Sequence, residues 1–379
     1  MTGACGACLR RSWLLAALSA GLAYQARDRE RLLELLALGD EDLVQAIGGR
    51  RRSELQERYA RFTPEEVRLT ADVETICRHH RGYPRALTQM SDGAPRMLYV
   101  SGTAQRLAAQ GSEPAVAIVG SRRATDYGME MARSLARGLA ASGVTVAGGL
   151  SDGIAVAALA GALEAGGRTL TVMDAGLDVA CPARRRTLFQ RARMTGCAVA
   201  ELPCGARSRN WCYTARERIV TGLAELTIVV EADESPGELL GAHVAQALGR
   251  TVAAVPGRVT SPVSRGTHAL LMEGAALVRG PEDALDLLYR GNPPRSVDAA
   301  GTPKRSSTKR QSQQLEPRLQ MTLEQVGAGR DTPAKLTAGS ADAGEVLLAL
   351  SELEAMGLLT RGDGGRYVPR ESLAGRAPL

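Results

Sequence analysis

The chain has 379 residues, which is long enough for two or three domains with full hydrophobic cores. Its 47 basic and 41 acidic residues give a formal net charge of +6, a mild excess that favours polyanionic partners. Aromatic residues make up only 3% of the chain, which argues against a nucleic-acid site built on many stacked bases. Such a site would have to rest on phosphate contacts and backbone amides.

The seven cysteines are an odd number scattered along the chain, which argues against a disulfide framework. Cys5 and Cys8 form a CxxC motif with no second pair near it in the sequence. We therefore expect reduced thiols there and no zinc site.

Residues 1–75 are predicted to form a helical N-terminal domain with no obvious chemistry. Arg10 and Arg11 precede an apolar run, residues 13–23, that imitates a signal peptide, but leucines continue at helical spacing to Leu38. This pattern favours a cytoplasmic chain, and no stretch approaches the ~20 apolar residues of a membrane span. Further helices are expected after residues 39–42 and from residues 63–66.

Residues 76–112 are interpreted as a connecting extension to the central domain. His79 and His80 lie in a polar part of it. We expect both to be surface residues rather than ligands.

Residues 113–290 alternate short apolar runs with helical patterns. Strands are predicted at residues 115–119, 144–147, 169–173, 198–200, 227–230 and 252–255. Helices are predicted at residues 129–141, 154–165, 184–194, 215–224 and 239–248. This alternation indicates an α/β, Rossmann-like parallel sheet with helices on both faces, whose strands end along one ligand-binding edge.

The first strand-to-helix turn is the strongest single feature of this domain. Gly120 ends the strand, Ser121, Arg122 and Arg123 follow, and Thr125 or Asp126 can cap the next helix. Unpaired amides at the positive end of a helix dipole bind anions, and the two arginines suggest a phosphate.

The motifs give little support for catalysis. The chain holds neither a P-loop nor a GxGxxG fingerprint, and its four histidines are not spaced for a triad. We therefore expect no enzyme activity, no catalytic or metal-binding residue and no cofactor. The predicted edge is instead rich in arginine: Arg122, Arg123, Arg184, Arg185, Arg186, Arg207, Arg209, Arg216, Arg218, Arg258 and Arg265. Together they favour an extended phosphate backbone over a small metabolite.

The C-terminal part is predicted to be a separate module. Residues 291–320 are rich in Pro, Ser, Lys and Arg, which indicates a flexible basic linker. Within residues 321–379, an amphipathic helix at 345–356 precedes a hairpin, an order typical of a winged helix.

Four runs of this sequence resemble the DNA-processing protein A family (DprA, also called Smf). They are AIVGSRRATDYG, AGGLSDGIAVAALAGALEAGGRTLTVMDAGLD, VVEADESPGELLGAHVAQALGRTVAAVPG and RGTHALLMEGA, and the resemblance covers residues 83–288. It implies a protein that binds single-stranded DNA, forms a homodimer through its Rossmann-like domain and loads the recombinase RecA during natural transformation, with no membrane partner.

The resemblance also implies site residues. The family's GSR turn corresponds to Gly120, Ser121 and Arg122, its basic loop to residues 182–186, and its RNR motif to residues 216–218. The residues expected to contact DNA are Gly120, Ser121, Arg122, Arg123, Gly149, Gly153, Pro182, Arg184, Arg185, Arg186, Tyr213, Arg216 and Arg218. Tyr213 and Phe189 are the aromatic residues expected to stack on bases.

Several positions depart from the family pattern. They are Ala155, Leu159, Glu217, the loop Pro236-Gly237-Glu238, Gly241 and His268. Glu217 places a negative charge between two arginines and should weaken the attraction for phosphate. Two alternatives stay open: a nucleotide hydrolase related to the lysine-decarboxylase-like group, and an adaptor protein that has lost DNA binding.

Overall fold

The computed structural model divides into two compact units, Met1–Pro294 and Arg295–Leu379. It describes residues 3–67, 69–102, 107, 114–179, 181–289, 316–327, 330, 332–337, 343–355, 359–361 and 367–369. The predicted basic linker falls almost entirely outside these residues.

The first unit is built on a nine-stranded sheet in the order β1-β2-β6-β5-β4-β3-β7-β8-β9. Seven strands are parallel: β3 (Ala115–Val119), β4 (Thr145–Gly149), β5 (Thr169–Met173), β6 (Cys197–Ala200), β7 (Leu226–Val229), β8 (Thr251–Ala254) and β9 (Ala276–Leu277). The α/β prediction is confirmed, and each predicted strand lies within two residues of its expected limits. The sequence analysis missed the antiparallel edge pair: β1 (Val73–Cys77) spans the end of the predicted helical domain and the start of the predicted extension, and β2 (Met97–Gly102) lies within that extension.

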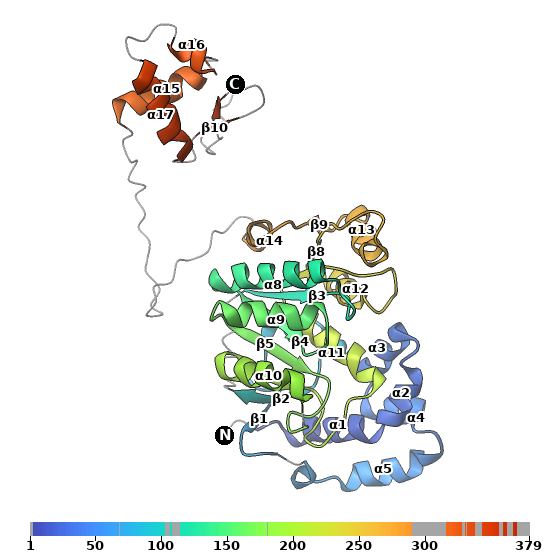
Figure 1. Ribbon diagram of the computed structural model, residues 1–379. Coiled ribbons are helices and arrows are strands. Elements are labelled where there is room, and N and C mark those ends of the chain that lie inside the picture. Colours follow the sequence, from blue (N-terminus) through green and yellow to red (C-terminus); the bar gives the residue numbers. More distant parts are fainter. Residues whose placement is uncertain are drawn as a thin grey trace, which may run out of the picture. The chain divides into compact units, whose positions relative to one another are not determined.

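Helices cover both faces of this sheet, as Figure 1 shows. Helices α8 (Asp126–Ala141), α9 (Ile154–Glu164) and α10 (Ala183–Thr195) cover one face, and α11 (Asn210–Leu223) and α12 (Leu240–Ala247) cover the other. Successive side chains of β3 point to opposite faces of the sheet. Val116 and Ile118 pack with α8 and α9 on one face. Ala117 and Val119 belong to the core beneath α11 and α12 on the other face. Thr125 caps α8, as predicted, because its hydroxyl accepts from the Gly128 amide at 3.2 Å.

Helix α11 begins at Asn210, five residues before its predicted start. Its first turn carries Trp211 and Cys212, which are buried against the N-terminal helices and not against the sheet. The local apolar pattern therefore did not reveal this turn.

The N-terminal helices share one core with the start of α11. They are α1 (Gly6–Ala17), α2 (Ser19–Gln25), α3 (Arg29–Ala37), α4 (Asp40–Ile47) and α5 (Arg52–Arg61). Trp211 Nε1 donates to Ser19 Oγ at 2.8 Å, and Asn210 Nδ2 donates to the Ala23 carbonyl at 3.1 Å. These bonds fix the N-terminal helices against the carboxyl edge of the sheet.

Short elements complete the first unit. The predicted helix from residue 63 is only a single 3₁₀ turn, Pro64–Glu66, because the chain soon becomes extended and enters β1. The others are 3₁₀ turns Gly49–Arg51, Ser91–Gly93 and Pro262–Ser264, and helices α6 (Arg85–Thr88), α13 (Arg265–Met272) and α14 (Pro281–Leu288).

The second unit holds α15 (Pro317–Gly327), α16 (Pro333–Thr337), α17 (Ala343–Ala355), and the antiparallel strands β10 (Leu359–Arg361) and β11 (Tyr367–Pro369). Leu350, Leu353 and Tyr367 contribute to its small core. The order of a helix followed by two antiparallel strands is as predicted. The turn of the predicted hairpin lies outside the described residues.

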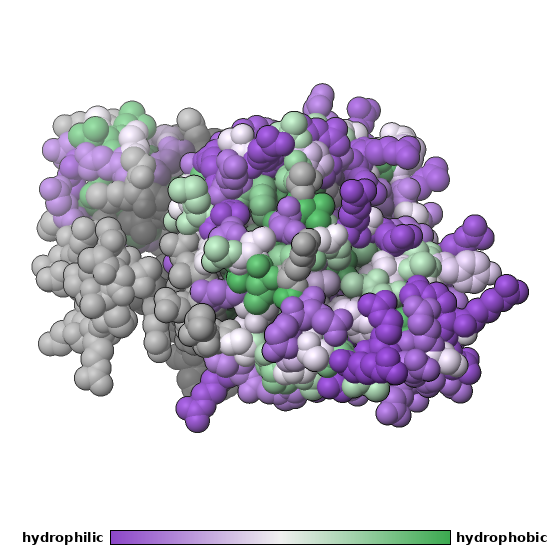
Figure 2. Space-filling model, turned by 90° about the horizontal axis from the view of Figure 1, so that it is seen from below, coloured by the Kyte–Doolittle hydropathy of each residue, from purple (hydrophilic) through white to green (hydrophobic). Residues whose placement is uncertain are grey.

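The surface carries mainly hydrophilic groups on the face seen in Figure 2, where hydrophobic residues are interspersed in small groups. Within the described parts of the chain, every helix is too short or too polar to cross a lipid bilayer.

A buried ion pair joins α1 to α4. Arg11 Nη1 lies 2.9 Å from Asp40 Oδ1, both side chains are less than a tenth exposed, and Arg11 Nη2 donates to the Leu36 carbonyl at 2.8 Å. The Tyr59 hydroxyl donates to Asp40 Oδ2 at 2.5 Å, and burial together with this bond raises the pKa of Tyr59 to about 12. Asp40 is therefore the shared acceptor that holds three N-terminal helices together.

We predict that Asp40→Asn lowers the free energy of unfolding by about 3 kcal/mol, because it leaves a buried guanidinium without its counter-charge. Urea denaturation followed by tryptophan fluorescence measures this, since the only two tryptophans, Trp13 and Trp211, belong to the same core. The control is Asp42→Asn, an exposed carboxylate in the same first turn of α4. Equal losses in the two variants would contradict the assigned role of Asp40.

Candidate functional site

A pocket of about 540 Å³ opens at the carboxyl ends of the parallel strands. The chain leaves β3 towards β4 on one side and leaves β7 towards β8 on the other, so the connections diverge where β3 and β7 lie side by side. Such a switch point leaves a crevice between the two loops. The pocket is lined by Ala26, Arg29, Arg122, Leu150, Ser151, Asp174, Arg185, Ser208, Arg209, Asn210, Tyr213, Thr214, Arg216, Ser235, Gly237 and Glu238.

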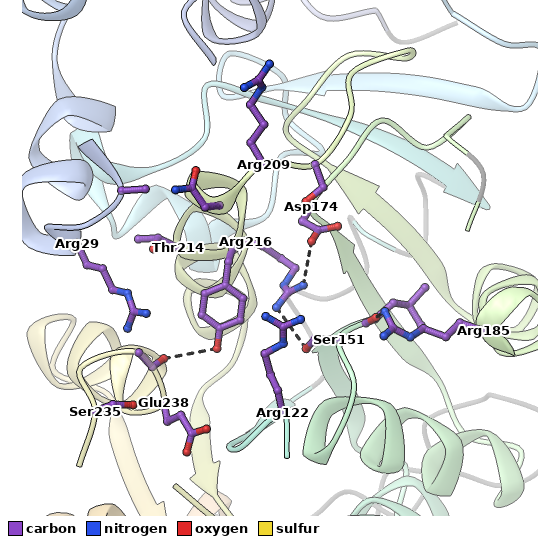
Figure 3. A pocket seen from close by; sticks show the side chains of 16 residues that line it. Arg29, Arg122, Ser151, Asp174, Arg185, Arg209, Thr214, Arg216, Ser235 and Glu238 are labelled. Carbon is purple, nitrogen blue, oxygen red and sulfur yellow. Dashed lines mark hydrogen bonds and ion pairs between the residues drawn. The ribbon is translucent and has the colours of Figure 1, made fainter. Parts of the chain in front are cut away.

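The pocket lining is strongly basic. It contains five arginines, Arg29, Arg122, Arg185, Arg209 and Arg216, against two carboxylates, those of Asp174 and Glu238. Figure 3 shows the guanidinium groups of Arg29 and Arg122 turned towards the middle of the pocket, while that of Arg209 points away from them. The pocket therefore suits an anion.

Arg216 forms the buried wall of the pocket. Its side chain is only 3% exposed and contacts Glu217 Oε1 at 2.7 Å. It also contacts Asp174 Oδ2 at 3.5 Å and Ser151 Oγ at 3.3 Å (Figure 3). Burial alone would lower its pKa, but the carboxylates of Glu217 and Asp174 outweigh burial and raise it. Glu217 thus balances most of the charge of Arg216, in line with the effect expected of this departure from the family motif.

Gly149 allows Arg216 to take this position. A Cβ atom at position 149 would lie 2.5 Å from Arg216 Nε. On the other side, the guanidinium carbon of Arg216 lies 4.9 Å from the centre of the Tyr213 ring, so Arg216 already covers one face of that ring. Tyr213 lines the pocket as predicted, with one face used by the protein itself.

The Gly-Ser turn after β3 offers fewer free amides than the sequence suggested. The Ser121 amide donates to the Glu231 carbonyl at 2.6 Å, and the Thr125 amide donates to the Glu231 carboxylate at 2.8 Å. Gly153 packs so closely on the turn that a Cβ atom there would collide with the Ser121 carbonyl. The expectation of a free Ser121 amide was therefore wrong, and the Arg122 side chain is what this turn brings to the pocket.

Glu238 adds a negative charge beside this turn. Its carboxylate accepts from Ser121 Oγ and from the Asp233 amide, both at 2.8 Å. It braces the β3 and β7 loops against each other and also lowers the positive charge of the pocket.

The basic loop after β5 is only partly directed into the pocket. Arg185 lines it and lies 2.5 Å from Asp152, while its Nη1 donates to the Leu150 carbonyl. Arg184 binds the same Asp152 carboxylate at 2.7 Å and stays largely exposed. Pro182, Arg184 and Arg186, like Arg123, are exposed but do not line the pocket.

Two predicted residues are buried elsewhere. Arg218 is 2% exposed and forms an ion pair with Glu201 at 2.6 Å, so the structure does not bring it to the pocket. Phe189 is 7% exposed within the core beneath α10, and the prediction that it stacks on a base was wrong. The sequence did not reveal that Phe189 lies on the side of α10 that packs into the core.

Arg29 is the pocket arginine that the sequence analysis missed. It begins α3, directly after the cap Asp28, in helices to which no chemistry was assigned. Its guanidinium packs on Gly237, where a Cβ atom would collide with it, and its buried Nη1 has no hydrogen-bond partner among the described residues. No local signal in the sequence marks this residue, because its place depends on how the N-terminal helices dock.

Comparison with known proteins connects this site to a family. The family model described as DNA recombination-mediator protein A matches residues 74–289. The Smf protein of Synechocystis is 30% identical over 311 residues, which cover 76% of this chain and 78% of that protein. A putative DprA of Mycobacterium tuberculosis is 41% identical over 174 residues, and this match spans less than half of either chain.

Solved structures agree with this match. The X-ray structure of DprA from Streptococcus pneumoniae has a TM-score of 0.59 at 28% identity, covering 74% of this chain and 96% of that one. A DprA structure from Helicobacter pylori, described by its single-stranded DNA binding mode, has a TM-score of 0.51 at 26% identity, covering 57% of this chain and 96% of that one. With the family model matching more than half of its length, this chain belongs to the DNA recombination-mediator protein A family of DNA-processing proteins.

Proposed function

We propose that this chain binds single-stranded DNA in the switch-point pocket and passes the strand to the recombinase RecA, without covalent chemistry of its own. The observation that carries this proposal is a set of three arginines that line the pocket: Arg29 from α3, Arg122 from the β3 turn and Arg209 from the start of α11. The guanidinium groups of Arg29 and Arg122 turn towards the middle of the pocket (Figure 3). None of the three forms an ion pair within the described part of the chain.

These three arginines differ from the neighbouring arginines because their guanidinium groups form no ion pair with a carboxylate of the described residues. Arg185, Arg216 and Arg218 each have a carboxylate partner within 2.7 Å, so the protein already balances their charges. Arg29, Arg122 and Arg209 have charge left for a ligand, and a guanidinium matches the oxygen atoms of a phosphate with two hydrogen bonds. The pocket therefore favours a phosphate-bearing ligand.

The size of the pocket favours a single strand over a duplex. A volume of about 540 Å³ lies within the range that takes one small ligand, so it would admit a nucleotide of an unpaired strand and not a double helix. Tyr213 supplies an aromatic surface, and the H. pylori relative is described by its binding of single-stranded DNA.

The remaining parts of the proposal rest on family membership. Transfer of DNA to RecA during natural transformation and dimerisation through the Rossmann-like domain belong to it, as does a winged-helix role for the second unit. Gly120, Ser121, Gly149 and Gly153 then shape the pocket, whereas the exposed residues Pro182, Arg123, Arg184 and Arg186 are proposed to guide the strand outside it.

A titration with labelled single- and double-stranded oligonucleotides at low salt tests the proposal. We expect tighter binding of the single strand and an affinity that falls steeply as salt is added. Absence of binding to either oligonucleotide would support the adaptor alternative. Release of ribose phosphate from nucleoside monophosphates would support the hydrolase.

We predict that Arg122→Ala weakens binding of all single-stranded sequences alike and reduces the salt slope by roughly 0.7, the value for one lost phosphate contact. Fluorescence anisotropy at several salt concentrations measures both effects. Arg50→Ala is the matched control, because Arg50 is an exposed arginine outside the pocket. An unchanged slope in Arg122→Ala would count against a phosphate contact at this residue.

We predict that Glu238→Gln strengthens single-strand binding about fivefold, or about 1 kcal/mol, because it removes a like charge from a phosphate site while one side-chain oxygen can still accept from Ser121. The same anisotropy titration measures the change. Glu234→Gln is the control, since Glu234 is exposed on the same loop but does not line the pocket. Weaker binding by Glu238→Gln would show that the bracing by Glu238 outweighs its charge.

A further inference from the structure

We infer that this chain binds one Zn²⁺ ion through Cys5, Cys8, Cys77 and His79, at the edge of the sheet that carries β1. The four side chains come from two distant segments, with Cys5 and His79 separated by 74 positions in the sequence. Cys5 and Cys8 lie outside the segment that the family model matches.

The four potential ligand atoms are already gathered. All of them lie within 4.8 Å of one another, and His79 Nδ1 is 3.3 Å from Cys5 Sγ and 3.5 Å from Cys8 Sγ. In a tetrahedral site with Zn–S bonds of about 2.3 Å and a Zn–N bond of about 2.0 Å, neighbouring ligand atoms are roughly 3.5–3.8 Å apart. The ligand atoms thus need only small side-chain adjustments to surround a zinc ion.

Regular elements hold the two halves of this cluster. Cys5 is the cap of α1 and Cys8 lies in its first turn, where the Cys8 amide donates to the Cys5 carbonyl at 3.0 Å. Cys77 is the last residue of β1, and the His80 amide donates to its carbonyl at 2.8 Å in the turn that carries His79. Because backbone bonds fix both segments, the ligands are arranged before any metal binds.

The types of ligand select the metal. Three thiolates and one imidazole are a typical set for structural zinc, whereas Mg²⁺ and Ca²⁺ require oxygen ligands. None of the seven cysteines, all of which lie in described residues, is part of a disulfide. The alternative use of a CxxC motif, a Cys5–Cys8 disulfide, would leave Cys77 and His79 without a role.

The sequence analysis expected no zinc site because no second pair of ligands lies near the CxxC motif in the sequence, whereas the structure brings a second pair of potential ligands to it. The second pair is Cys77 and His79, separated by a single residue. It comes into contact with the first only because the Ala4 amide bonds Thr75 Oγ1 at 2.9 Å and aligns the N-terminus with β1.

A zinc ion here would fasten the N-terminus to an edge strand. β1 is the outermost strand of the nine-stranded sheet on this side, and an unsecured edge strand tends to fray or to pair with other chains. Zinc binding to folded protein adds its binding free energy to the stability of this edge.

Metal analysis of the full-length protein tests the inference. Protein purified under reducing conditions, supplied with ZnCl₂ and freed of excess metal by gel filtration, should carry one zinc per chain by mass spectrometry. Replacement by Co²⁺ should give the thiolate-to-cobalt charge-transfer absorption of a tetrahedral site. Chelation of the zinc should lower the thermal unfolding midpoint of the wild-type protein.

Matched variants locate the site. Cys77→Ser should lose the equimolar metal, and His79→Ala should bind it at least about tenfold more weakly. Cys181→Ser and His243→Ala remove a cysteine and a histidine elsewhere in the first unit and should keep one zinc per chain. Tryptophan fluorescence checks that each variant is folded, and His79→Ala alters an exposed side chain.

Two outcomes would overturn the inference. One is wild-type protein that carries no zinc after loading, a result that needs no variant. The other is zinc that stays equimolar in both Cys77→Ser and His79→Ala, or that is lost equally from the two controls.

Discussion

The Glu231 carboxylate decides how the whole carboxyl edge of the sheet is used. It accepts from the amide and the hydroxyl of Thr125 at the start of α8, and Gly128 is needed there because a Cβ atom would collide with it. A helix N-terminus after a Gly-Ser turn would otherwise be the natural place for a phosphate. In this chain the protein supplies that anion itself, so the proposed binding of a strand rests on arginine side chains, Arg122 of this turn and Arg29 of α3, and not on the start of α8.

The arginines of this edge divide into two kinds for an energetic reason. A buried guanidinium is stable only with a counter-charge, since removal from water costs several kcal/mol. Arg216 and Arg218 are therefore paired with their own carboxylates, Glu217 and Glu201, and of the two only Arg216 forms a wall of the pocket. Arg122 is exposed and Arg29 is only half-buried, so neither side chain is fully removed from water and neither requires such a partner. The RNR-like motif thus shapes the pocket, while residues outside it provide the charge for a ligand.

The sequence revealed what depends on local patterning and missed what depends on docking. The run from Ala115 to Val119 and its capped helix could be predicted because burial on both faces demands a continuous apolar strand and Thr125 demands a helix start. The position of Arg29 in the pocket could not be predicted, because its contact with Gly237 exists only once the N-terminal helices pack on α11. Phe189 was misjudged for the same reason, since an aromatic residue next to a basic loop can face the core or the solvent with the same local sequence. The four proposed zinc ligands are a further case. The sequence spacing within each pair does not indicate a metal site, and the two pairs meet only because the N-terminus packs beside β1.

These cases point to the N-terminal helices as one wall of the proposed DNA site and not a separate attachment. Trp211 lies in the first turn of α11, the helix that carries Tyr213 and Arg216. It is buried in the core of the N-terminal helices, where its Nε1 donates to Ser19 Oγ. The same helices deliver Arg29 to the pocket, and the chain segment that precedes them is the one that reaches Cys77 and His79. A change that loosens α1 or α3 would therefore displace a pocket arginine without touching the sheet. Under the proposed function, affinity for a nucleic acid would depend on the docking of helices whose own sequence carries no sign of that role.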